Sequence, residues 1–320
     1  RELSYEETRI KTLWDIPKEE HFVGGHSLCA GCTASTIVRH LLKVAGRNTI
    51  VVNATGCVEV STTSFPYTAW RVPWLHVAFE NAGAVASGVE SAIKAMKAKG
   101  MIPFEKEINV IALAGDGGSF DIGFQALSGL MERGHKVMFV IYDNEAYMNT
   151  GIQRSGATPF GAWTTTTPVT RRIRGEWRTK KDMFDIAIAH GLDYVATANP
   201  AYPVDMDVKF QKGLNTDGPS LVHVIMPCTT GWRFEPRYGI TIAKLATETA
   251  VWINMEYDRG NFSVTVPVRK RKHVREYLKL QGRYSHLSDL EIELIQQQID
   301  RKVEEINRRA GKEVIGPLEA

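Results

Sequence analysis

The sequence contains few cysteines and no long hydrophobic run. Four of its 320 residues are cysteine, which is too few for a fold stabilised by disulfides. No stretch reaches the roughly 18 uninterrupted apolar residues expected of a membrane-spanning helix. The first 15 residues, RELSYEETRIKTLWD, are charged where a secretory signal would need an apolar run. We therefore expect a soluble, cytoplasmic protein that does not bind a membrane.

Neither sign of charge is in large excess. The chain carries 39 Lys and Arg against 36 Asp and Glu, a net charge of +3, which is too close to neutral to indicate a polyanionic partner. With 43% hydrophobic residues, the chain can bury one large core or two modest ones. Composition therefore indicates a globular protein and argues against nucleic-acid binding.

Apolar segments of strand length alternate with helical patterns over about residues 35–230. Strands that are apolar on both faces and are separated by helices are typical of a parallel sheet covered on both sides. We therefore predict an α/β fold with a doubly wound, mostly parallel sheet, in a first domain of residues 1–255. The predicted strands lie in NTIVVNATG, INVIALAGDGG, KVMFVIYDN, DYVATA and PSLVHVIMPC.

The composition changes after residue 255. The stretch VPVRKRKHVREYLKLQGRYSHLS is basic and unlike a core, whereas the segment that follows repeats Ile and Val at helical spacing. We predict a second unit, residues 256–320, formed by an arm and a helix that pack on a partner subunit. The apolar stripe of this helix consists of Ile292, Ile295, Ile299, Val303 and Ile306.

A glycine-rich turn follows one of the predicted strands. Gly115, Asp116 and Gly117 come directly after a buried strand. The glycines would let the backbone approach a phosphate, and the Asp116 carboxylate is a ligand that Mg²⁺ prefers. The next strand ends at Asp143 and Asn144, and the right-handed crossover rule places both strand ends at one edge of the sheet. This predicts an Mg²⁺ that holds a diphosphate, although a Gly-Asp-Gly sequence alone is often only a turn.

The four cysteines form a second candidate site. Cys29 and Cys32 are three positions apart, Cys57 follows the first predicted strand, and Cys228 ends the last one. Two thiols at the carboxyl ends of parallel strands face the same edge, and the Cys29–Cys32 segment could lie across them. Four thiolates suit either a cubane iron-sulfur cluster or a zinc ion. Cys57 or Cys228 taken singly could also be a small buried hydrophobe.

Together these features resemble a known family. A Gly-Asp-Gly turn followed by Asn at the end of the next strand is similar to the thiamine diphosphate motif. From about residue 22 to residue 240 the chain resembles the beta subunit of the 2-oxoacid:ferredoxin oxidoreductases. The blocks that carry the resemblance are ATGCVEV, PWLHVAFENAGAVASGVE, GDGGSFDIGFQALSGLMERGH, YDNEAYMNTGIQRSGATPFGAWTTTTP and CTTGW.

The resemblance implies thiamine diphosphate and Mg²⁺ as cofactors. It implies that the side chains of Asp116 and Asn144 and the backbone carbonyl of Ala146 ligate Mg²⁺. Asn149 is similar to the family's active-site asparagine, which lies near the thiazolium and the substrate. The alternative for Asn149 is an asparagine that caps the turn before Gly151.

The resemblance also favours one occupant of the cysteine site. Cys29, Cys32, Cys57 and Cys228 match the ligands of a [4Fe-4S] cluster in the family. Such a cluster could accept the electrons released when a 2-oxoacid is oxidised, whereas zinc could accept none. Many relatives have glycine after the second cysteine, and Thr33 stands there in this chain. That difference affects hydrogen bonding to sulfur rather than the number of ligands.

The implied activity is oxidative decarboxylation of a 2-oxoacid with electrons passed to ferredoxin. Pyruvate, with coenzyme A as acyl acceptor, is the first expectation, and relatives that act on oxalate or other 2-oxoacids are the alternative. A function of another class is a non-redox thiamine diphosphate decarboxylase or carboligase with a structural zinc. Because the cofactor-activating glutamate lies on a partner chain in the family, Glu80 is interpreted as a helix-start carboxylate and other subunits are expected.

Overall fold

The structure is a computed structural model that describes residues 10–319. Of the charged amino-terminal stretch considered above, residues 1–9 lie outside the described residues. Within the described part, no helix is both long and apolar enough to cross a membrane.

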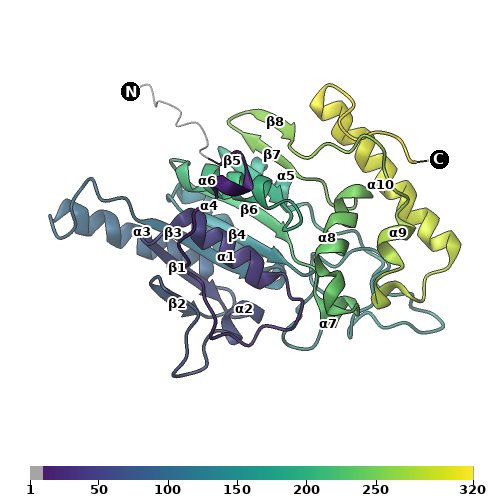
Figure 1. Ribbon diagram of the computed structural model, residues 1–320, viewed down its shortest axis with the longest axis horizontal. Coiled ribbons are helices and arrows are strands. Elements are labelled where there is room, and N and C mark those ends of the chain that lie inside the picture. Colours follow the sequence, from purple (N-terminus) through teal and green to yellow (C-terminus); the bar gives the residue numbers. More distant parts are fainter. Residues whose placement is uncertain (1–9, 320) are drawn as a thin grey trace.

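An eight-stranded sheet with strand order β2-β1-β3-β4-β6-β5-β7-β8 forms the centre of the molecule (Figure 1). The first six strands are parallel, and β7 and β8 form an antiparallel hairpin at one edge. This confirms the predicted doubly wound, mostly parallel α/β fold. The strands are β1 (Thr49–Ala54), β2 (Trp74–Val77), β3 (Asn109–Gly115), β4 (Met138–Asp143), β5 (Tyr194–Ala198), β6 (Ser220–Ile225), β7 (Met255–Asp258) and β8 (Asn261–Val264).

Helices cover both faces of the sheet and give two buried cores. Side chains of α1 and α6 fill one core, and side chains of α3, α4, α5, α8 and α10 fill the other. Every residue of β4, β5 and β6 is buried, which explains why these strands read as continuous apolar runs. The longer helices are α1 (Ala34–Ala45), α3 (Ala82–Ala98), α4 (Phe124–Arg133), α5 (Met183–Ala189), α6 (Pro203–Asn215), α8 (Gly239–Glu248) and α10 (Asp289–Ala310).

Short helical turns connect these elements where the candidate residues lie. The turns α2 (Cys57–Val60) and α7 (Thr229–Trp232) follow β1 and β6, and η2 (Gly117–Asp121) is a π-helical turn between β3 and α4. The remaining turns are η1 (Leu13–Asp15), η3 (Pro236–Tyr238), α9 (Arg275–Leu278) and η4 (Gly282–Tyr284). The segment between β4 and α5 contains isolated bridges but no further strand or helix, so it is a long loop.

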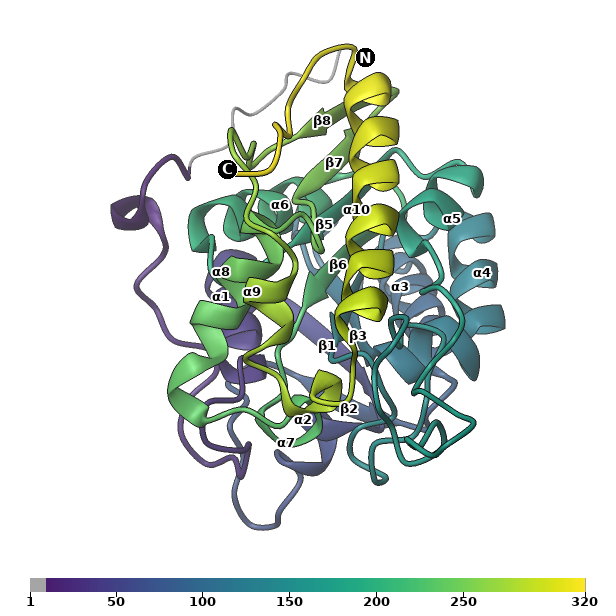
Figure 2. The same cartoon turned by 90° about the vertical axis from the view of Figure 1, so that its right-hand side faces the viewer.

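The carboxyl-terminal part is integrated into this chain's own fold. β7 pairs with β5, so the sheet continues past residue 255, the predicted boundary. In α10, Ile299, Val303 and Ile306 are buried in the core of this chain, and Figure 2 shows α10 lying along the molecule beside α9. The predicted apolar stripe therefore packs on the sheet's own helices. Sequence periodicity identified the apolar face of this helix but could not identify the surface that it covers.

We predict that Ile306→Ala destabilises the protein by about 2–5 kcal/mol, because it deletes apolar atoms from a site that is 1% exposed. Leu290→Ala on the same helix is the control, since Leu290 is 72% exposed and such positions tolerate truncation within about 0.5 kcal/mol. Urea unfolding of both variants measures the difference. Equal, small effects at both positions would contradict the packing of α10 on this core.

Candidate active site

Two neighbouring strands deliver the central residues of the site. β3 and β4 are parallel and paired in register, with Gly115 opposite Tyr142. The chain leaves β3 at Asp116 and leaves β4 at Asn144, so these two residues lie side by side at the carboxyl edge of the sheet. The crossover argument made from the sequence correctly placed them together.

Three oxygen atoms converge at this edge. The side-chain oxygen of Asn144 faces Oδ1 of Asp116 at 3.0 Å and the carbonyl oxygen of Ala146 at 2.8 Å. Mg²⁺ binds oxygens at 2.0–2.1 Å in an octahedron, which separates adjacent ligand oxygens by about 2.9 Å. The Asn144 amide can also adopt the opposite orientation, in which its NH₂ donates hydrogen bonds to both of these oxygens. The donor set and its spacing therefore fit Mg²⁺.

Asp116 is held rigidly in this position. Its side chain is 1% exposed, and Oδ2 accepts a hydrogen bond of 2.5 Å from the Ser155 hydroxyl. Ser155 is itself positioned by its backbone N–H, which donates to Oγ1 of Thr158 at 2.9 Å. Burial, together with the negative charge of Asp143, raises the pKa of the Asp116 carboxyl. A divalent cation would reverse that effect, because it favours the ionised carboxylate.

The two glycines of the motif are in contact with aromatic rings. A Cβ atom on Gly117 would lie 2.6 Å from the ring of Tyr147, and one on Gly115 would lie 3.2 Å from the ring of Tyr142. The glycines were predicted to let the backbone approach a phosphate. The contacts in the described structure show that they also make room for these two tyrosines, which the sequence did not indicate.

Asn149 lies in the loop after β4, beyond Asn144 and Ala146, two of the predicted Mg²⁺ ligands. Backbone pairing between Tyr147 and Gln153 closes a turn around it, and its side chain is exposed. The Tyr147 ring that packs on Gly117 anchors this turn to the Gly-Asp-Gly motif. Asn149 is therefore presented at the same edge as Asp116 without being buried by this chain. Glu80, which precedes α3, is exposed as well.

Buried charges flank Asn144 on both sides. Asp143 contacts Lys180 at 2.5 Å and His223 at 2.7 Å. Glu145 contacts the same Lys180 at 3.0 Å and Arg283 at 2.6 Å. Burial alone would raise the pKa of Asp143, but Lys180 and His223 outweigh it and hold that pKa at about 2. We call Asp143, Glu145, Lys180, His223 and Arg283 the charge network.

The charge network also fixes the backbone of residues 143–146, which hold two of the predicted Mg²⁺ ligands and which we call the metal loop. Glu145 has a left-handed backbone with φ of 66°, a conformation that costs free energy for a residue with a side chain. The guanidinium of Arg283 lies 3.8 Å from the ring centroid of Trp232, and Nε1 of Trp232 donates to the carbonyl oxygen of Asn144 at 2.8 Å. Arg283 and Trp232 thus hold both the side chain and the backbone of this loop from outside it.

The four cysteines gather beside the same edge. All four are free thiols, and they range from exposed at Cys29 to buried at Cys228. Burial, with smaller contributions from the other cysteines, raises the pKa of Cys57 to about 12 and that of Cys32 to about 11. The Cys228 sulfur accepts a hydrogen bond from the Gly231 N–H at 3.4 Å. The four sulfurs are therefore close enough to influence one another electrostatically.

Their spacing does not suit a single metal ion. Among residues 10–319, no three side chains of His, Cys, Asp or Glu are close enough together to bind one ion. A tetrahedral zinc site would need its sulfurs about 2.3 Å from the metal. An iron-sulfur cluster is larger than one ion, so its cysteine ligands lie farther apart. Four cysteines near one another are residue types that suit either group.

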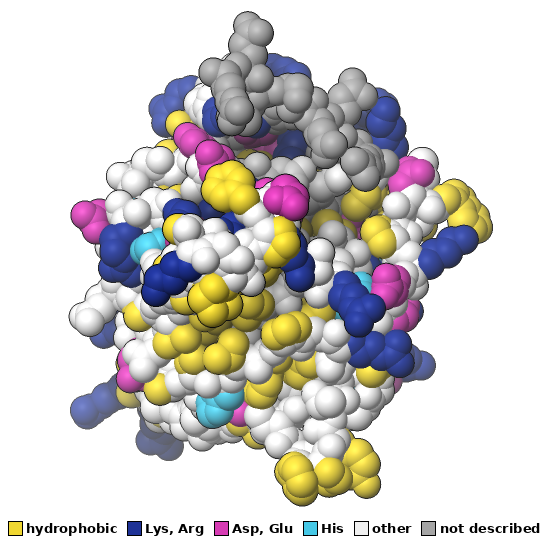
Figure 3. Space-filling model, turned by 90° about the vertical axis from the view of Figure 1, so that its left-hand side faces the viewer, with side chains coloured by type: hydrophobic (Ala, Val, Ile, Leu, Met, Phe, Trp, Pro, Cys, Tyr) yellow, Lys and Arg dark blue, Asp and Glu magenta, His cyan; other side chains and the backbone are white. Residues whose placement is uncertain are grey.

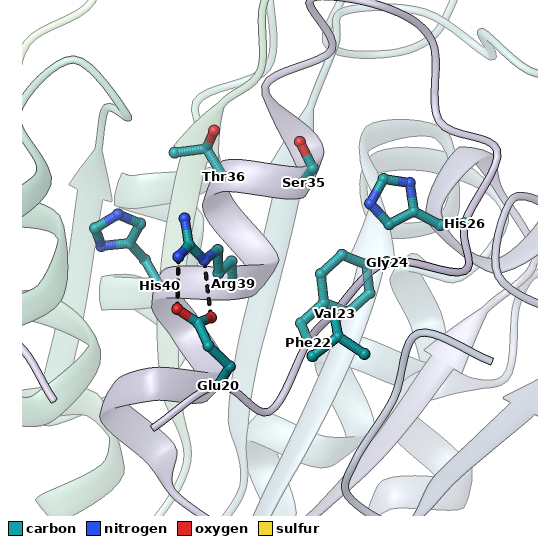
Figure 4. A pocket seen from close by; sticks show the side chains of 9 residues that line it. All are labelled: Glu20, Phe22, Val23, Gly24, His26, Ser35, Thr36, Arg39 and His40. Carbon is teal, nitrogen blue, oxygen red and sulfur yellow. Dashed lines mark hydrogen bonds and ion pairs between the residues drawn. The ribbon is translucent and has the colours of Figure 1, made fainter. Parts of the chain in front are cut away.

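Two cavities lie along the amino-terminal end of α1. One of about 290 Å³ includes Cys29, Cys32 and Arg237 in its lining. A larger one of about 420 Å³ is bordered by Phe22, His40 and the Glu20–Arg39 ion pair (Figure 4). Neither lining includes Asp116 or Asn144. Both cavities are therefore separate from the converging oxygens.

Comparison with known proteins places the chain in a class of enzymes. Residues 54–224 match the family described as "Thiamine pyrophosphate enzyme, C-terminal TPP binding domain". The chain is 57% identical to the pyruvate synthase subunit PorB of Methanocaldococcus jannaschii over 290 residues, which cover 91% of this chain and 97% of that one. It is 46% identical to the ketoisovalerate oxidoreductase subunit VorB of Pyrococcus furiosus over 311 residues, covering 96% and 98%.

A solved structure shares the fold at lower similarity. It is a 2-oxoglutarate:ferredoxin oxidoreductase from Magnetococcus marinus, with 19% identity, a TM-score of 0.54, and coverage of 71% of this chain and 80% of that chain. The chain belongs to the family of beta subunits of 2-oxoacid:ferredoxin oxidoreductases, and is thus an enzyme subunit. The family resemblance inferred from the sequence is confirmed.

Several residues of the site were not predicted from the sequence. Ser155 contacts Asp116, and Lys180, Trp232 and Arg283 contact the metal loop, yet these four residues lie between 11 and 139 positions after Asn144. None has a spacing or motif that indicates such a role. Ser155 and Trp232 lie in blocks that carry the family resemblance, and Lys180 and Arg283 lie near other basic residues, but neither signal assigned these contacts.

We predict that Arg283→Met destabilises the protein by about 3–5 kcal/mol, because Glu145, which is 3% exposed, would keep a buried charge with one partner removed. Adding Glu145→Gln to this variant should restore part of the loss. Arg237→Met is the matched control, since Arg237 pairs with Glu235 at the surface with 69% of its side chain exposed. Denaturant unfolding of the wild type, Arg283→Met, Glu145→Gln, the double variant and the control measures the coupling, and additive effects of the two buried changes would contradict the pairing.

Proposed function

We propose that this chain holds thiamine diphosphate, Mg²⁺ and one [4Fe-4S] cluster in an enzyme that oxidatively decarboxylates a 2-oxoacid, most simply pyruvate, and passes the electrons to ferredoxin. The observation that carries the proposal is the convergence of the Asp116, Asn144 and Ala146 oxygens at the spacing of an octahedral Mg²⁺ site. The family match to a thiamine pyrophosphate binding domain, which spans this motif, supports the identity of the cofactor.

Asp116, Asn144 and the Ala146 carbonyl would ligate Mg²⁺, and the metal would join them to the diphosphate. Gly115 and Gly117 border this position and keep side chains away from it. When bound, thiamine diphosphate supplies the carbon nucleophile and the electron sink that decarboxylation of a 2-oxoacid requires. This chain contributes the rigid clamp, in which Ser155 orients Asp116 and the charge network orients the loop that carries Asn144.

Asn149 is proposed to be the catalytic residue supplied by this chain. Its position in an exposed turn anchored on Gly117 suits a side chain that meets substrate at a boundary with another subunit. An amide can donate a hydrogen bond to the substrate's carboxylate or carbonyl oxygen without changing protonation state. The alternative, a turn-capping role, would leave substrate affinity unchanged when the side chain is removed.

Cys29, Cys32, Cys57 and Cys228 are proposed to bind the [4Fe-4S] cluster. Their grouping beside the Asp116 edge puts a one-electron acceptor close to the place where a 2-oxoacid would be oxidised. Metal binding would require the thiolates, so it would overcome the raised pKa values of the free thiols and release protons. The non-redox alternative, with a structural zinc, is less well supported because the sulfurs do not converge on a single-ion geometry.

Other subunits are proposed to complete the site. Several large apolar side chains around α2 and β2 are exposed, including Phe65 at 96%, Tyr67 at 71%, Val60 at 44% and Leu75 at 41%. Figure 3 shows hydrophobic side chains gathered on one face of the molecule with charged groups mostly around them. Such a patch is typical of a protein interface. We propose that the exposed side chains of residues 256–319 also contact these subunits, whereas the buried stripe of α10 packs within this chain.

The substrate proposal rests on the names of the relatives. A pyruvate synthase subunit is 57% identical to this chain and a ketoisovalerate oxidoreductase subunit is 46% identical. We therefore place pyruvate first, with coenzyme A as the acyl acceptor, and 2-oxoisovalerate second. Oxalate is a further alternative from the wider family. We also propose a cytoplasmic location, because cysteines that bind an iron-sulfur cluster need a reducing compartment.

We predict that Asp116→Ala abolishes retention of thiamine diphosphate in the assembled complex, because the variant removes a hard oxygen from an Mg²⁺ that has few protein ligands. The cofactor content is measured after gel filtration in Mg²⁺-containing buffer. Asp121→Asn, five positions further along the same turn, is the control and should retain the cofactor. Stoichiometric cofactor in the Asp116 variant would show that the clamp has been assigned to the wrong residues.

We predict that the anaerobically purified complex contains iron and labile sulfide bound to this chain and reduces a viologen dye with pyruvate and coenzyme A. The chain alone should show no turnover. A parallel assay with 2-oxoisovalerate, 2-oxoglutarate and oxalate tests the substrate order. Stoichiometric zinc without labile sulfide would overturn the redox function and support the decarboxylase or carboligase alternative.

A further inference from the structure

Tyr142 connects the metal loop to the cysteine site. It is the residue before Asp143 on β4, and alternation along the strand directs the two side chains to opposite faces. Tyr142 is buried in the core formed with α1 and α6, against which Cys32 also packs. Its neighbour Asp143 instead contacts Lys180 and His223.

The Tyr142 ring crosses the sheet edge beneath two glycines. A Cβ on Gly115, at the end of β3, would lie 3.2 Å from Cε2 of the ring. A Cβ on Gly56, just past β1, would lie 2.5 Å from the phenol oxygen. The ring therefore passes from β4 under β3 and ends against the residue that precedes Cys57. Two positions without side chains form the slot that it occupies.

The Tyr142 hydroxyl, at the end of this slot, is a hydrogen-bond donor without an acceptor in the described structure. Tyr142 is 1% exposed, and its hydroxyl has no hydrogen-bond partner among the described residues. The Val58 amide approaches the oxygen without completing a hydrogen bond. A phenol with its ordinary proton is a hydrogen-bond donor at neutral pH. Native proteins rarely bury such a donor unpaired, which points to an acceptor that is a bound group or its ligand.

Two other cysteines already have hydrogen-bond donors near their sulfurs. The Gly231 N–H donates to the Cys228 sulfur at 3.4 Å, and the Thr230 hydroxyl lies 3.9 Å from the Cys29 sulfur. Hydrogen bonds to the sulfur ligands of an iron-sulfur cluster stabilise its reduced, more negative state and so raise its reduction potential. Cys57 has no such donor in the described structure other than the one that Tyr142 could supply.

We propose that the Tyr142 hydroxyl donates a hydrogen bond to the Cys57 sulfur when the four cysteines hold their cluster, and that this bond raises the cluster's reduction potential. The inference rests on the proposed [4Fe-4S] site and deepens it. Tyr142 acts as a positioning residue, because it touches a cluster ligand and not the substrate. Its ring also packs against Gly115 of the cofactor motif, so one side chain borders both sites.

The test is Tyr142→Phe in the complete, anaerobically prepared complex, with the cluster potential measured by titration monitored by electron paramagnetic resonance. The expected result is a reduction potential that is more negative by about 59 mV. This shift corresponds to a tenfold change in the one-electron equilibrium constant. Iron, sulfide and thiamine diphosphate contents should stay at wild-type levels. Tyr194→Phe is the control, since it deletes a buried hydroxyl that donates to Glu256, and should leave the potential unchanged.

Wild-type potential in a Tyr142→Phe complex that retains its cluster would overturn the inference while leaving the proposed function intact. Absence of iron and sulfide from the wild-type complex would instead overturn the proposed function. Pulsed resonance measurements in D₂O give a second readout, because a deuteron coupled to the cluster should disappear in Tyr142→Phe alone. Its persistence in that variant would also count against Tyr142 as the donor.

Gly56 offers an independent check of the geometry. The methyl group of Gly56→Ala would meet the phenol oxygen at 2.5 Å but would lie 3.7 Å from Cζ. The variant should therefore destabilise the protein in the wild-type background and be tolerated in the Tyr142→Phe background. Thermal unfolding of the single and double variants measures this relief. Equal destabilisation in both backgrounds would show that the hydroxyl does not lie against Gly56.

Discussion

The site depends on the neutralisation of two buried carboxylates that flank Asn144. Asp143 and Glu145 are each 3% exposed or less, and two ionised groups so close together in a protein interior would repel strongly without compensation. Lys180 lies between them and contacts both, while Arg283 and His223 contact one each. This arrangement allows a tight loop with a left-handed residue to present the amide of Asn144 and the carbonyl of Ala146 together. The fold supplies the strand end, but the charge network fixes the loop.

The two proposed binding sites share one structural origin. Parallel strands direct their carboxyl ends to a single edge, where Asp116, Asn144, Cys57 and Cys228 all follow strands of the same sheet. The alternating directions of side chains on β4 then divide the region. Asp143 joins the charge network on one face of the sheet, and Tyr142 extends toward the cysteines on the other. Adjacent positions on one strand thus serve separate sites.

The sequence predicted the parts of this structure that depend on local pattern. Largely apolar runs identified β1, β3, β4, β5 and β6, because strands buried on both faces have few polar positions. The short edge strand β2 and the β7–β8 hairpin were missed, since they are partly exposed and mixed in composition. Asp116 and Asn144 were found because strand order places them together. Ser155 and Arg283 were not, because only tertiary packing brings Ser155 to Asp116 and Arg283 to Glu145.

The position of Arg283 late in the sequence affects the order in which the protein folds during synthesis. Arg283 lies 138 positions after Glu145, so the metal loop cannot acquire its full set of counter-charges until most of the chain has left the ribosome. A nascent chain that ended after β8 would contain all eight strands, yet Glu145 would lack its arginine and Trp232 its stacked guanidinium. This loop is therefore among the last parts of the subunit to reach its final conformation during synthesis. Thiamine diphosphate bound through it, as proposed here, would require the completed polypeptide.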